Sequence, residues 1–208
     1  MLTLQNCHIE LNQQPLVQDL SFSVQAGKVL SLMGPSGCGK STLLNYLCGT
    51  LDPMFRASGQ LSLGTTRLEI LPVEKRHVGV LYQSPLLFPH MNNLENLMFA
   101  IPAHIRGKLR KELAMNKLHE LGLEHKACDL PSNLSGGQQA RVALLRTLLS
   151  EPDYLLLDEP FGKLDTTLRQ SVREFVLEQV QNSQLPTVLV THDHEDAKAM
   201  GGKVLMLT

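Results

Sequence analysis

The sequence predicts an α/β fold with a mostly parallel sheet, an N-terminal antiparallel β subdomain and an inserted helical subdomain. Three observations predict this fold. Apolar and polar residues alternate over the first 25 positions, short apolar runs separated by helical segments recur later, and a helix-like stretch broken by prolines lies between two of these runs. Alternation is typical of antiparallel strands with one buried face, whereas short uninterrupted apolar runs are typical of strands buried in a parallel sheet.

The N-terminal alternation consists of two runs on either side of the turn-like residues 12–15. Leu2 and Leu4 belong to the first run, and the second extends from Leu16 to Val24. Two alternating runs joined by a short turn predict an antiparallel β-hairpin.

The central sheet is predicted from four apolar runs. The first, Val29–Met33, ends at a glycine-rich turn and is followed by helical spacing from Lys40 to Cys48. The other three runs are Val78–Leu81, Tyr154–Leu157 and Thr187–Val190. Helical segments separate the runs, so we expect buried parallel strands and a doubly wound core.

The helical subdomain is predicted from a change of pattern between Gln83 and Ser135. Leu, Met and charged residues follow helical spacing there, broken by prolines at 85, 89, 102 and 131. No repeat, low-complexity tract or long linker separates this stretch from the rest. We therefore assign residues 84–134 to a helical subdomain inserted within one domain that spans 1–208.

Composition excludes several classes of protein. With 43% hydrophobic residues, a chain of 208 residues can bury a substantial core. Lys and Arg number 19 against 20 Asp and Glu, so we expect neither a nucleic-acid partner nor general binding to anionic membranes. No apolar stretch reaches the roughly 18 residues that span a bilayer, and the first residues do not resemble a signal peptide. Four scattered cysteines without CxxC spacing predict neither a zinc site nor disulfides.

A phosphate loop follows the first buried strand. Its sequence is Gly34-Pro35-Ser36-Gly37-Cys38-Gly39-Lys40-Ser41-Thr42. Glycines let successive N–H groups turn inward at the start of a helix, which makes a binding site for ATP phosphates. We expect Lys40 to contact the β- and γ-phosphates, Ser41 to offer its hydroxyl to Mg²⁺, and Thr42 to reach the α- or β-phosphate. Strand, loop and helix together predict a P-loop NTPase core, and a plain glycine-rich turn is the alternative.

Two acids end the strand that begins at Tyr154. Asp158 suits the aspartate that helps to hold Mg²⁺ in phosphate-loop enzymes, directly or through water. Glu159, one residue further, would orient or deprotonate the attacking water. The alternative is a pair of solvated acids, which the upstream phosphate loop disfavours.

A pentapeptide downstream of the phosphate loop points to one family. Leu134-Ser135-Gly136-Gly137-Gln138, preceded by a phosphate loop, resembles the signature of the ATP-binding cassette (ABC) ATPases, in the importer-like subfamily of transporter ATP-binding subunits. The resemblance implies that these five residues close on the γ-phosphate of ATP bound by a second copy, in a homodimer or with a pseudo-symmetric partner. An ordinary glycine-rich helix start would explain Ser135 but not the full match.

The resemblance assigns three further residues. His192 is similar to the switch histidine, which contacts the γ-phosphate and the catalytic water, and joins Glu159 as a candidate catalytic residue. Gln83 is similar to the glutamine that senses Mg²⁺ and water while it hinges the helical subdomain, so it is both a catalytic and a metal-ligand candidate. Asp165 is expected in the loop that crosses the dimer interface, although Gly162 replaces the more usual serine there.

Two features depart from the family pattern. Many members stack adenine on an aromatic residue in the first hairpin, where this chain has Leu11, so an aliphatic ATP contact is expected. The chain also stops at Thr208 without the C-terminal regulatory domain of some importer ATPases, so regulation through such a domain is not expected.

The resemblance implies a motor function. Leu87-Phe88-Pro89-His90 is common in ABC importers, and exposed apolar residues there would receive a coupling helix from a transmembrane permease. The expected function is an ATPase subunit that couples ATP binding, dimer closure and hydrolysis to solute transport, with import and an extracytoplasmic solute-binding protein favoured. The expected location is the cytoplasmic face of the inner membrane, bound through the permease, with the isolated chain soluble.

Three alternative functions stay open. An exporter ATPase is the nearest of them. A soluble ABC ATPase of translation or DNA maintenance usually carries two cassettes or a long coiled-coil insertion, and neither occurs in this sequence. A small kinase ranks last, because it would need an acceptor site and would not explain the signature at 134–138.

Overall fold

The computed structural model describes residues 1–207, and its description leaves out the side chain of Thr167. The chain forms two compact units. The first, here called the sheet unit, contains Met1–Val80, Asp153–Glu159 and the chain from Leu177 onward. The second, here called the helical unit, contains Leu81–Pro152 and Pro160–Val176.

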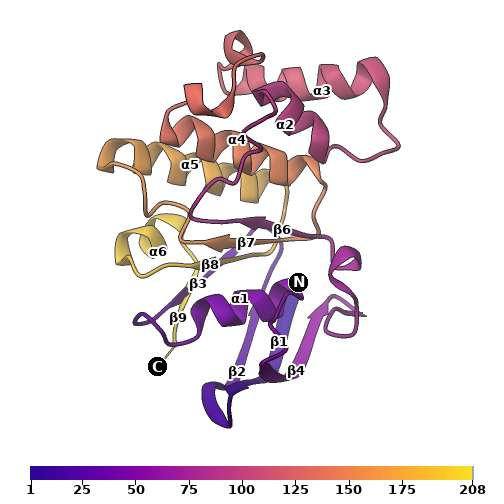
Figure 1. Ribbon diagram of the computed structural model, residues 1–208. Coiled ribbons are helices and arrows are strands. Elements are labelled where there is room, and N and C mark those ends of the chain that lie inside the picture. The colour runs from indigo at the N-terminus through magenta and orange to yellow at the C-terminus, as the bar shows by residue number, and fades with distance from the viewer. Residues whose placement is uncertain (208) are drawn as a thin grey trace. The chain divides into compact units, whose positions relative to one another are not determined.

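An antiparallel sheet forms the N-terminal part of the sheet unit (Figure 1). Its strands are β1 (Leu2–Leu11), β2 (Gln14–Val24), β4 (Phe55–Leu63) and β5 (Thr66–Arg67), in the order β2-β1-β4-β5. Strands β1 and β2 pair antiparallel, which confirms the predicted hairpin. The pairing of β1 with β4 was not predicted from the sequence.

The second sheet has the order β6-β7-β8-β3-β9. These strands are β3 (Val29–Met33), β6 (Val78–Leu81), β7 (Tyr154–Asp158), β8 (Thr187–Val190) and β9 (Lys203–Met206). Strand β3 pairs parallel with both β8 and β9, and β7 pairs parallel with β8. The four predicted strands and the mostly parallel sheet are therefore confirmed, although Val78 and Val80 of β6 are only half-buried.

Two helices of the sheet unit follow strands of this sheet directly. Helix α1 (Lys40–Cys48) follows β3, and α6 (His194–Met200) follows β8. A single turn of 3-10 helix, Val73–Lys75, precedes β6.

One hydrophobic core holds both sheets of the sheet unit. It includes Leu4 and Ile9 from the antiparallel sheet, Leu32 and Leu156 from the parallel sheet, and Leu47 from α1. Burial of these side chains supplies the main driving force for packing the layers.

The far end of α1 is fixed by side chains. The hydroxyl of Tyr154, in β7, donates to the backbone oxygen of Leu47 at 2.9 Å. The Arg76 guanidinium donates to the oxygens of Tyr46 and Leu47 at 2.9 and 3.3 Å. The last carbonyls of a helix have no partner within it, so these bonds satisfy them and hold α1 in place.

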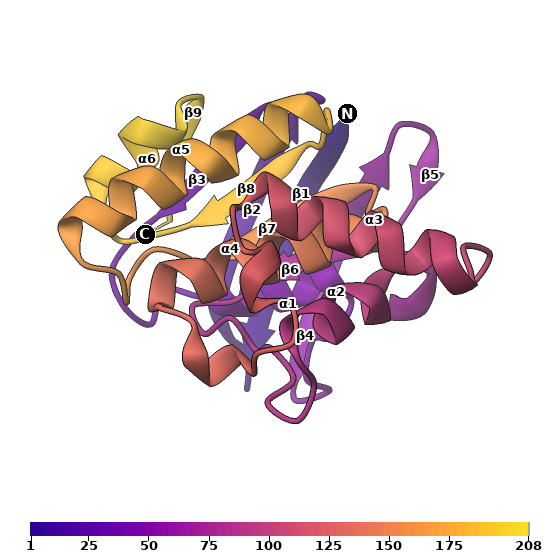
Figure 2. The same ribbon diagram turned by 90° about the horizontal axis from the view of Figure 1, so that it is seen from above.

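The helical unit contains α2 (Asn93–Ala100), α3 (Gly107–Glu120), α4 (Gly136–Leu149) and the start of α5 (Thr166–Asn182). Two turns of 3-10 helix, Glu124–Lys126 and Pro131–Asn133, lie between α3 and α4. Helix α2 packs against both α3 and α4 (Figure 2).

The core of the helical unit is built by apolar residues from all four helices and the turns, including Leu97, Leu118, Leu123 and Leu145. Helix α2 starts at a capping box, in which Asn92 accepts from the Glu95 amide and Glu95 accepts from the Asn92 amide. Within residues 1–207, none of the helices combines the length and the apolar character needed to cross a bilayer.

Candidate functional site

The phosphate loop connects β3 to α1. Gly37 has φ 84°, and Gly39, the N-cap of α1, has φ 91°. Only glycine adopts these left-handed conformations without steric cost. The loop therefore leads directly into the start of α1, where backbone N–H groups and the helix dipole favour the binding of an anion.

Lys40 is the first residue of α1, and its side chain is 8% exposed. Its Nζ donates to the backbone oxygens of Gly34 and Pro35 at 2.8 and 2.7 Å. These bonds hold the ammonium group against the loop. A fixed cation at a helix start is suited to bind the terminal phosphates of a nucleotide.

Strand β2 lies against this loop, a contact that sequence reasoning missed. A Cβ added to Gly39 would lie 3.3 Å from Val17 Cγ2 and 3.4 Å from the backbone oxygen of Leu16. The apolar alternation of β2 marked Leu16 for the predicted hairpin and gave no sign that this strand borders the nucleotide loop. Gly39 is therefore favoured by its φ angle, and a side chain at this position would also crowd Val17.

Leu11, the predicted adenine contact, is the last residue of β1 and is half-buried. Its cross-strand partners are Gln14 and Phe55. No nucleotide contact of this residue is defined by the structure, so its role stays a prediction.

Replacing Leu11 with tyrosine is expected to tighten ATP binding. An aromatic pair adds about 0.5–1.5 kcal/mol beyond area burial, which corresponds to an affinity gain of up to about tenfold. Isothermal titration of the variant with ATP measures the effect, and Leu11→Ile is the matched control that adds no ring. Unchanged affinity in Leu11→Tyr would show that residue 11 does not face the base.

Asp158 and Glu159 stand at the end of β7. Asp158 is half-buried, and its burial, followed by the neighbouring charge of Glu159, raises the pKa of its carboxyl, with Lys40 opposing the shift. Glu159 has φ 45°, and its amide donates to the backbone oxygen of Val190 at 3.0 Å. This bond fixes the chain after β7 to the end of the neighbouring strand β8.

His192 meets Glu159 from β8. The Nδ1 atom of His192 lies 3.0 Å from Glu159 Oε1. Thr191, between β8 and His192, is buried and donates its hydroxyl to Asp196 of α6 at 3.1 Å. The structure therefore brings together the two predicted catalytic residues of the sheet unit, which are 33 positions apart in sequence.

The oxygen donors of the sheet unit fit a magnesium ion. Mg²⁺ prefers carboxylate, hydroxyl and water oxygens, and Asp158 and Ser41 supply the first two. Burial raises the pKa of the Asp158 carboxyl because it disfavours the charged form, which a cation beside it would stabilise. Gln83, the third predicted metal ligand, belongs to the helical unit.

The signature segment starts α4. Ser135 is the N-cap, its hydroxyl accepts from the Gln138 amide at 3.4 Å, and the Gln138 side chain accepts from the Ser135 amide at 3.0 Å. Leu134 is 5% exposed and anchors the segment in the core. Ser135 and Gly136 are exposed, so this helix start is accessible to an anion from outside the unit.

Gln83 and Gly136 line one cavity of about 270 Å³ within the helical unit. Lys163 and Leu164 line the same cavity, and Lys163 Nζ donates to Ser84 Oγ at 2.8 Å. Lys163, in the loop before α5, thus contacts the segment that begins at Gln83.

Asp165, predicted to lie in the dimer loop, forms a hydrogen bond to the nearby backbone. Its Oδ1 accepts from the amide of Leu168 at 3.0 Å, at the start of α5. An acidic side chain that accepts from the first turn stabilises a helix N-terminus. The position of Asp165 is therefore tied to α5.

The two signature glycines predict different responses to alanine. A Cβ on Gly137 would lie 2.5 Å from Leu168 Cγ, whereas one on Gly136 would lie 3.7 Å from Leu164 Cδ2. Gly137→Ala is expected to lower the free energy of unfolding by about 1–3 kcal/mol through overpacking. Urea denaturation measures this, and Gly136→Ala is the matched control with ordinary contact distance. Equal stability of the two variants would contradict the assigned packing.

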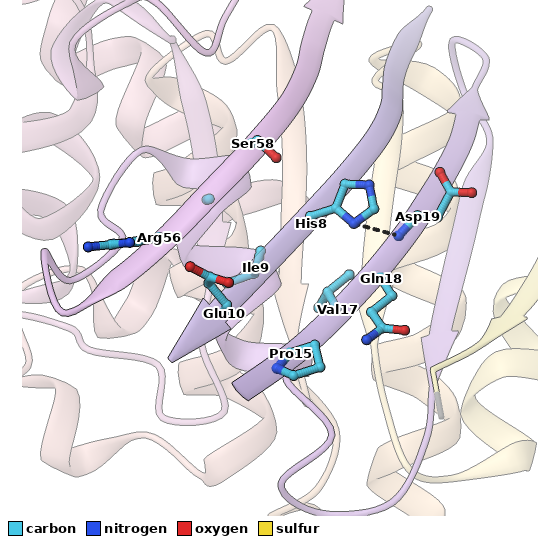
Figure 3. A pocket seen from close by; sticks show the side chains of 10 residues that line it. His8, Ile9, Glu10, Pro15, Val17, Gln18, Asp19, Arg56 and Ser58 are labelled. Carbon is cyan, nitrogen blue, oxygen red and sulfur yellow. Dashed lines mark hydrogen bonds between the residues drawn. The ribbon is translucent and has the colours of Figure 1, made fainter. Parts of the chain in front are cut away.

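A further cavity, of about 510 Å³, lies on the antiparallel sheet (Figure 3). His8, Asp19 and Arg56 are among its lining residues, and the Asp19 amide donates to His8 Nδ1 at 3.3 Å. None of the predicted ATP-binding residues lines it.

Similarity to known proteins covers nearly the whole chain. Residues 17–162 match the family described as ABC transporter. Over 199 residues the chain is 43% identical to the uncharacterized ABC transporter ATP-binding protein YnjD of Escherichia coli K12, which covers 96% of this chain and 92% of YnjD. It is 39% identical to the Fe(3+) ions import ATP-binding protein FbpC of Rhizobium etli over 207 residues, 99% of this chain. That alignment spans only 58% of FbpC.

A solved structure has the same fold. The dimeric structure of the ATP-binding cassette MJ0796 in a post-hydrolysis state, bound to ADP and Pi, superposes with a TM-score of 0.80 at 28% identity. The superposition covers 100% of this chain and 94% of MJ0796. It confirms the P-loop NTPase fold predicted from the sequence. With the family match across most of the chain, the protein belongs to the ABC transporter family and is an ATP-binding, ATP-hydrolysing cassette of that family.

Proposed function

We propose that this chain is the motor subunit of an ABC importer, in which ATP binding, dimer closure and hydrolysis drive a partner permease. The observation that carries the proposal is an exposed apolar surface in the helical unit. Leu86 is 58% exposed and Phe99 62% exposed, and Phe99 lines a groove of about 480 Å³. The groove is lined by His90, Met91, Glu95, Met98, Phe99 and Arg110.

This surface, here called the docking surface, suits a short amphipathic helix. The rings of Phe99 and Phe88 pack in a T-shaped arrangement with centroids 4.9 Å apart, which holds the exposed Phe99 ring in place. Glu95 and Arg110 line the groove and supply charges of both signs. A cytoplasmic helix of a transmembrane permease would bury its apolar face here and pair its polar residues with these charges.

The hydrolytic step is assigned to residues of the sheet unit. Lys40 binds the β- and γ-phosphates, and the amides at the start of α1 bind the phosphate oxygens. Glu159, held 3.0 Å from His192, accepts a proton from the attacking water while His192 fixes the carboxylate. Ser41 and Asp158 would hold Mg²⁺, which neutralises charge on the phosphates when bound.

Dimer closure is assigned to the signature. In the proposed dimer, Ser135 and the glycines of one copy contact the γ-phosphate held by the phosphate loop of the other. The exposed, capped start of α4 supports this role, as does the dimeric form of the similar cassette MJ0796. ATP then joins two copies, and its hydrolysis releases them.

Import is favoured over export by the relatives. FbpC proteins, at 37–40% identity, are named Fe(3+) ions import ATP-binding proteins. In the proposed system, an extracytoplasmic solute-binding protein delivers cargo to the permease, and this chain acts at the cytoplasmic face of the membrane. Export stays the alternative, because YnjD, at 43% identity, is uncharacterized.

Affinity purification tests the proposal. The tagged chain is isolated from detergent-solubilised membranes of its own host, and co-eluting proteins are identified by mass spectrometry. A multispanning permease supports the motor function, and a binding protein with it supports import. Recovery from the cytosol with ribosomal or DNA-bound partners, and no permease, would overturn it.

A variant separates docking from catalysis. Phe99→Asp places a charge on the exposed ring position of the docking surface and touches none of the assigned catalytic residues. It is expected to retain ATP hydrolysis and to lose the permease. Permease recovery equal to that of the unmodified chain would show that docking occurs elsewhere.

A further inference from the structure

Arg146, near the end of α4, is a half-buried cation with an unusual set of partners. Its Nη1 donates to the backbone oxygen of Leu86 at 3.0 Å and to Asn96 Oδ1 at 3.4 Å. Its guanidinium also lies 5.1 Å from the centroid of the Phe88 ring. Within residues 1–207, no carboxylate pairs with it, and burial lowers its pKa. A buried cation without a counter-charge is costly, so these contacts define its role.

Two of the partners of Arg146, Leu86 and Phe88, belong to the segment Leu86–Met91, here called the docking loop. The loop has no helix or strand, and Leu86 has φ 46°, which is uncommon for a residue with a side chain. The Leu86 carbonyl that Arg146 binds is therefore part of a strained turn. Without this contact, Leu86 would be freer to relax.

Asn96 fixes the same loop from the side of α2. It is fully buried, its Oδ1 accepts from the Phe88 amide at 2.8 Å, and its Nδ2 donates to the oxygens of Phe88 and Met91, both at 3.1 Å. Both main-chain groups of Phe88 are thus bound by one side chain. Since Arg146 contacts Asn96 as well as Leu86, α4 connects to the loop directly at Leu86 and indirectly through Asn96.

The other end of α4 is the signature. Arg146 follows Ser135 by 11 residues, about 16 Å of helix. A capped, well-packed helix of this length moves as a unit, so displacement of its start displaces Arg146. We propose that Arg146 is a positioning residue that transmits closure of the signature on ATP to the docking loop, and thereby to the permease. The inference depends on the proposed dimer and docking roles.

Hydrogen exchange tests the proposal in the chain itself. In a Glu159→Gln background, which is expected to hold Mg-ATP and the closed dimer, exchange of the Phe88 and Met91 amides is measured with and without Mg-ATP. The unmodified Arg146 chain is expected to show a nucleotide-dependent change at both amides. Arg146→Met is expected to bind ATP and dimerise equally well and to lose that change. Arg146→Lys keeps a cation and is expected to restore part of it.

The control is Arg106→Met. The Arg106 guanidinium also donates to a backbone carbonyl of the helical unit, that of Ala103 at 3.0 Å, and Arg106 does not line the groove of the docking surface. This variant is expected to retain the nucleotide-dependent change.

Two results overturn the inference. If Arg146 serves only to stabilise the loop, Arg146→Met accelerates exchange by the same factor with and without Mg-ATP, and the ratio of the two rates stays that of the unmodified chain. A closed dimer whose docking-loop amides do not respond at all also contradicts it. A chain that stays monomeric in Mg-ATP would instead contradict the proposed function, which gel filtration of the same samples reveals.

Discussion

A Lys40→Ala chain is expected to lose ATP hydrolysis. The ammonium group of Lys40 is held at the phosphate loop by the oxygens of Gly34 and Pro35, and alanine leaves no cation there. Loss of a preorganised donor to developing charge lowers turnover by about 100- to 1,000-fold, and the loss of phosphate binding adds to that. Phosphate release at saturating Mg-ATP, together with nucleotide titration, measures both effects.

Lys28→Ala is the control for Lys40→Ala. Lys28 is exposed, so its replacement removes one positive charge from the sheet unit without touching the phosphate loop. This variant is expected to keep full activity. Steady-state hydrolysis retained in Lys40→Ala would contradict the assignment of the phosphate loop.

A Glu159→Gln chain is expected to bind ATP and fail to hydrolyse it. Glutamine keeps the shape of the side chain and a contact to His192, but it cannot accept the proton of the attacking water. Removal of a general base lowers turnover by about 100- to 10,000-fold. Since hydrolysis is the proposed signal for separation, the dimer should accumulate in Mg-ATP, which gel filtration with light scattering detects.

Glu151→Gln serves as the matched control for Glu159→Gln. Glu151 is exposed and precedes β7, so the same chemical change there is expected to leave turnover and dimerisation unaltered. A Glu159→Gln chain that hydrolyses ATP at the unmodified rate would remove Glu159 from the mechanism. A chain that elutes only as monomer would count against the ATP-bound dimer.

The centre of the parallel sheet could be predicted from the sequence because β3, β7 and β8 are buried on both faces. Every residue of β3 and β8 is buried, and such runs are visible without any knowledge of neighbours. Strand β4 was missed because most of its residues are polar or exposed and only Leu61 is buried. Its place depends on pairing with β1, which is a long-range contact.

The candidate site divides in the same way. The phosphate loop, Asp158 and the signature are short motifs, whose local spacing carries the chemistry. The roles of Leu16 and Arg146 arise from contacts with distant segments. Arg146 and Leu86, for example, are 60 positions apart, and the sequence around either residue does not predict the contact. Tertiary contacts of this kind leave no periodic signal.

The hydroxyl of Tyr154 connects two parts of the proposed catalytic site before any substrate binds. It fastens the end of α1, whose other end carries Lys40, to the strand that ends in Asp158. The cation and the acid therefore keep their spacing as a property of the core, and little reorganisation is left for the moment of reaction. Removing this hydroxyl would fix Lys40 and Asp158 less firmly relative to each other. The rate of ATP hydrolysis would therefore fall together with the free energy of unfolding.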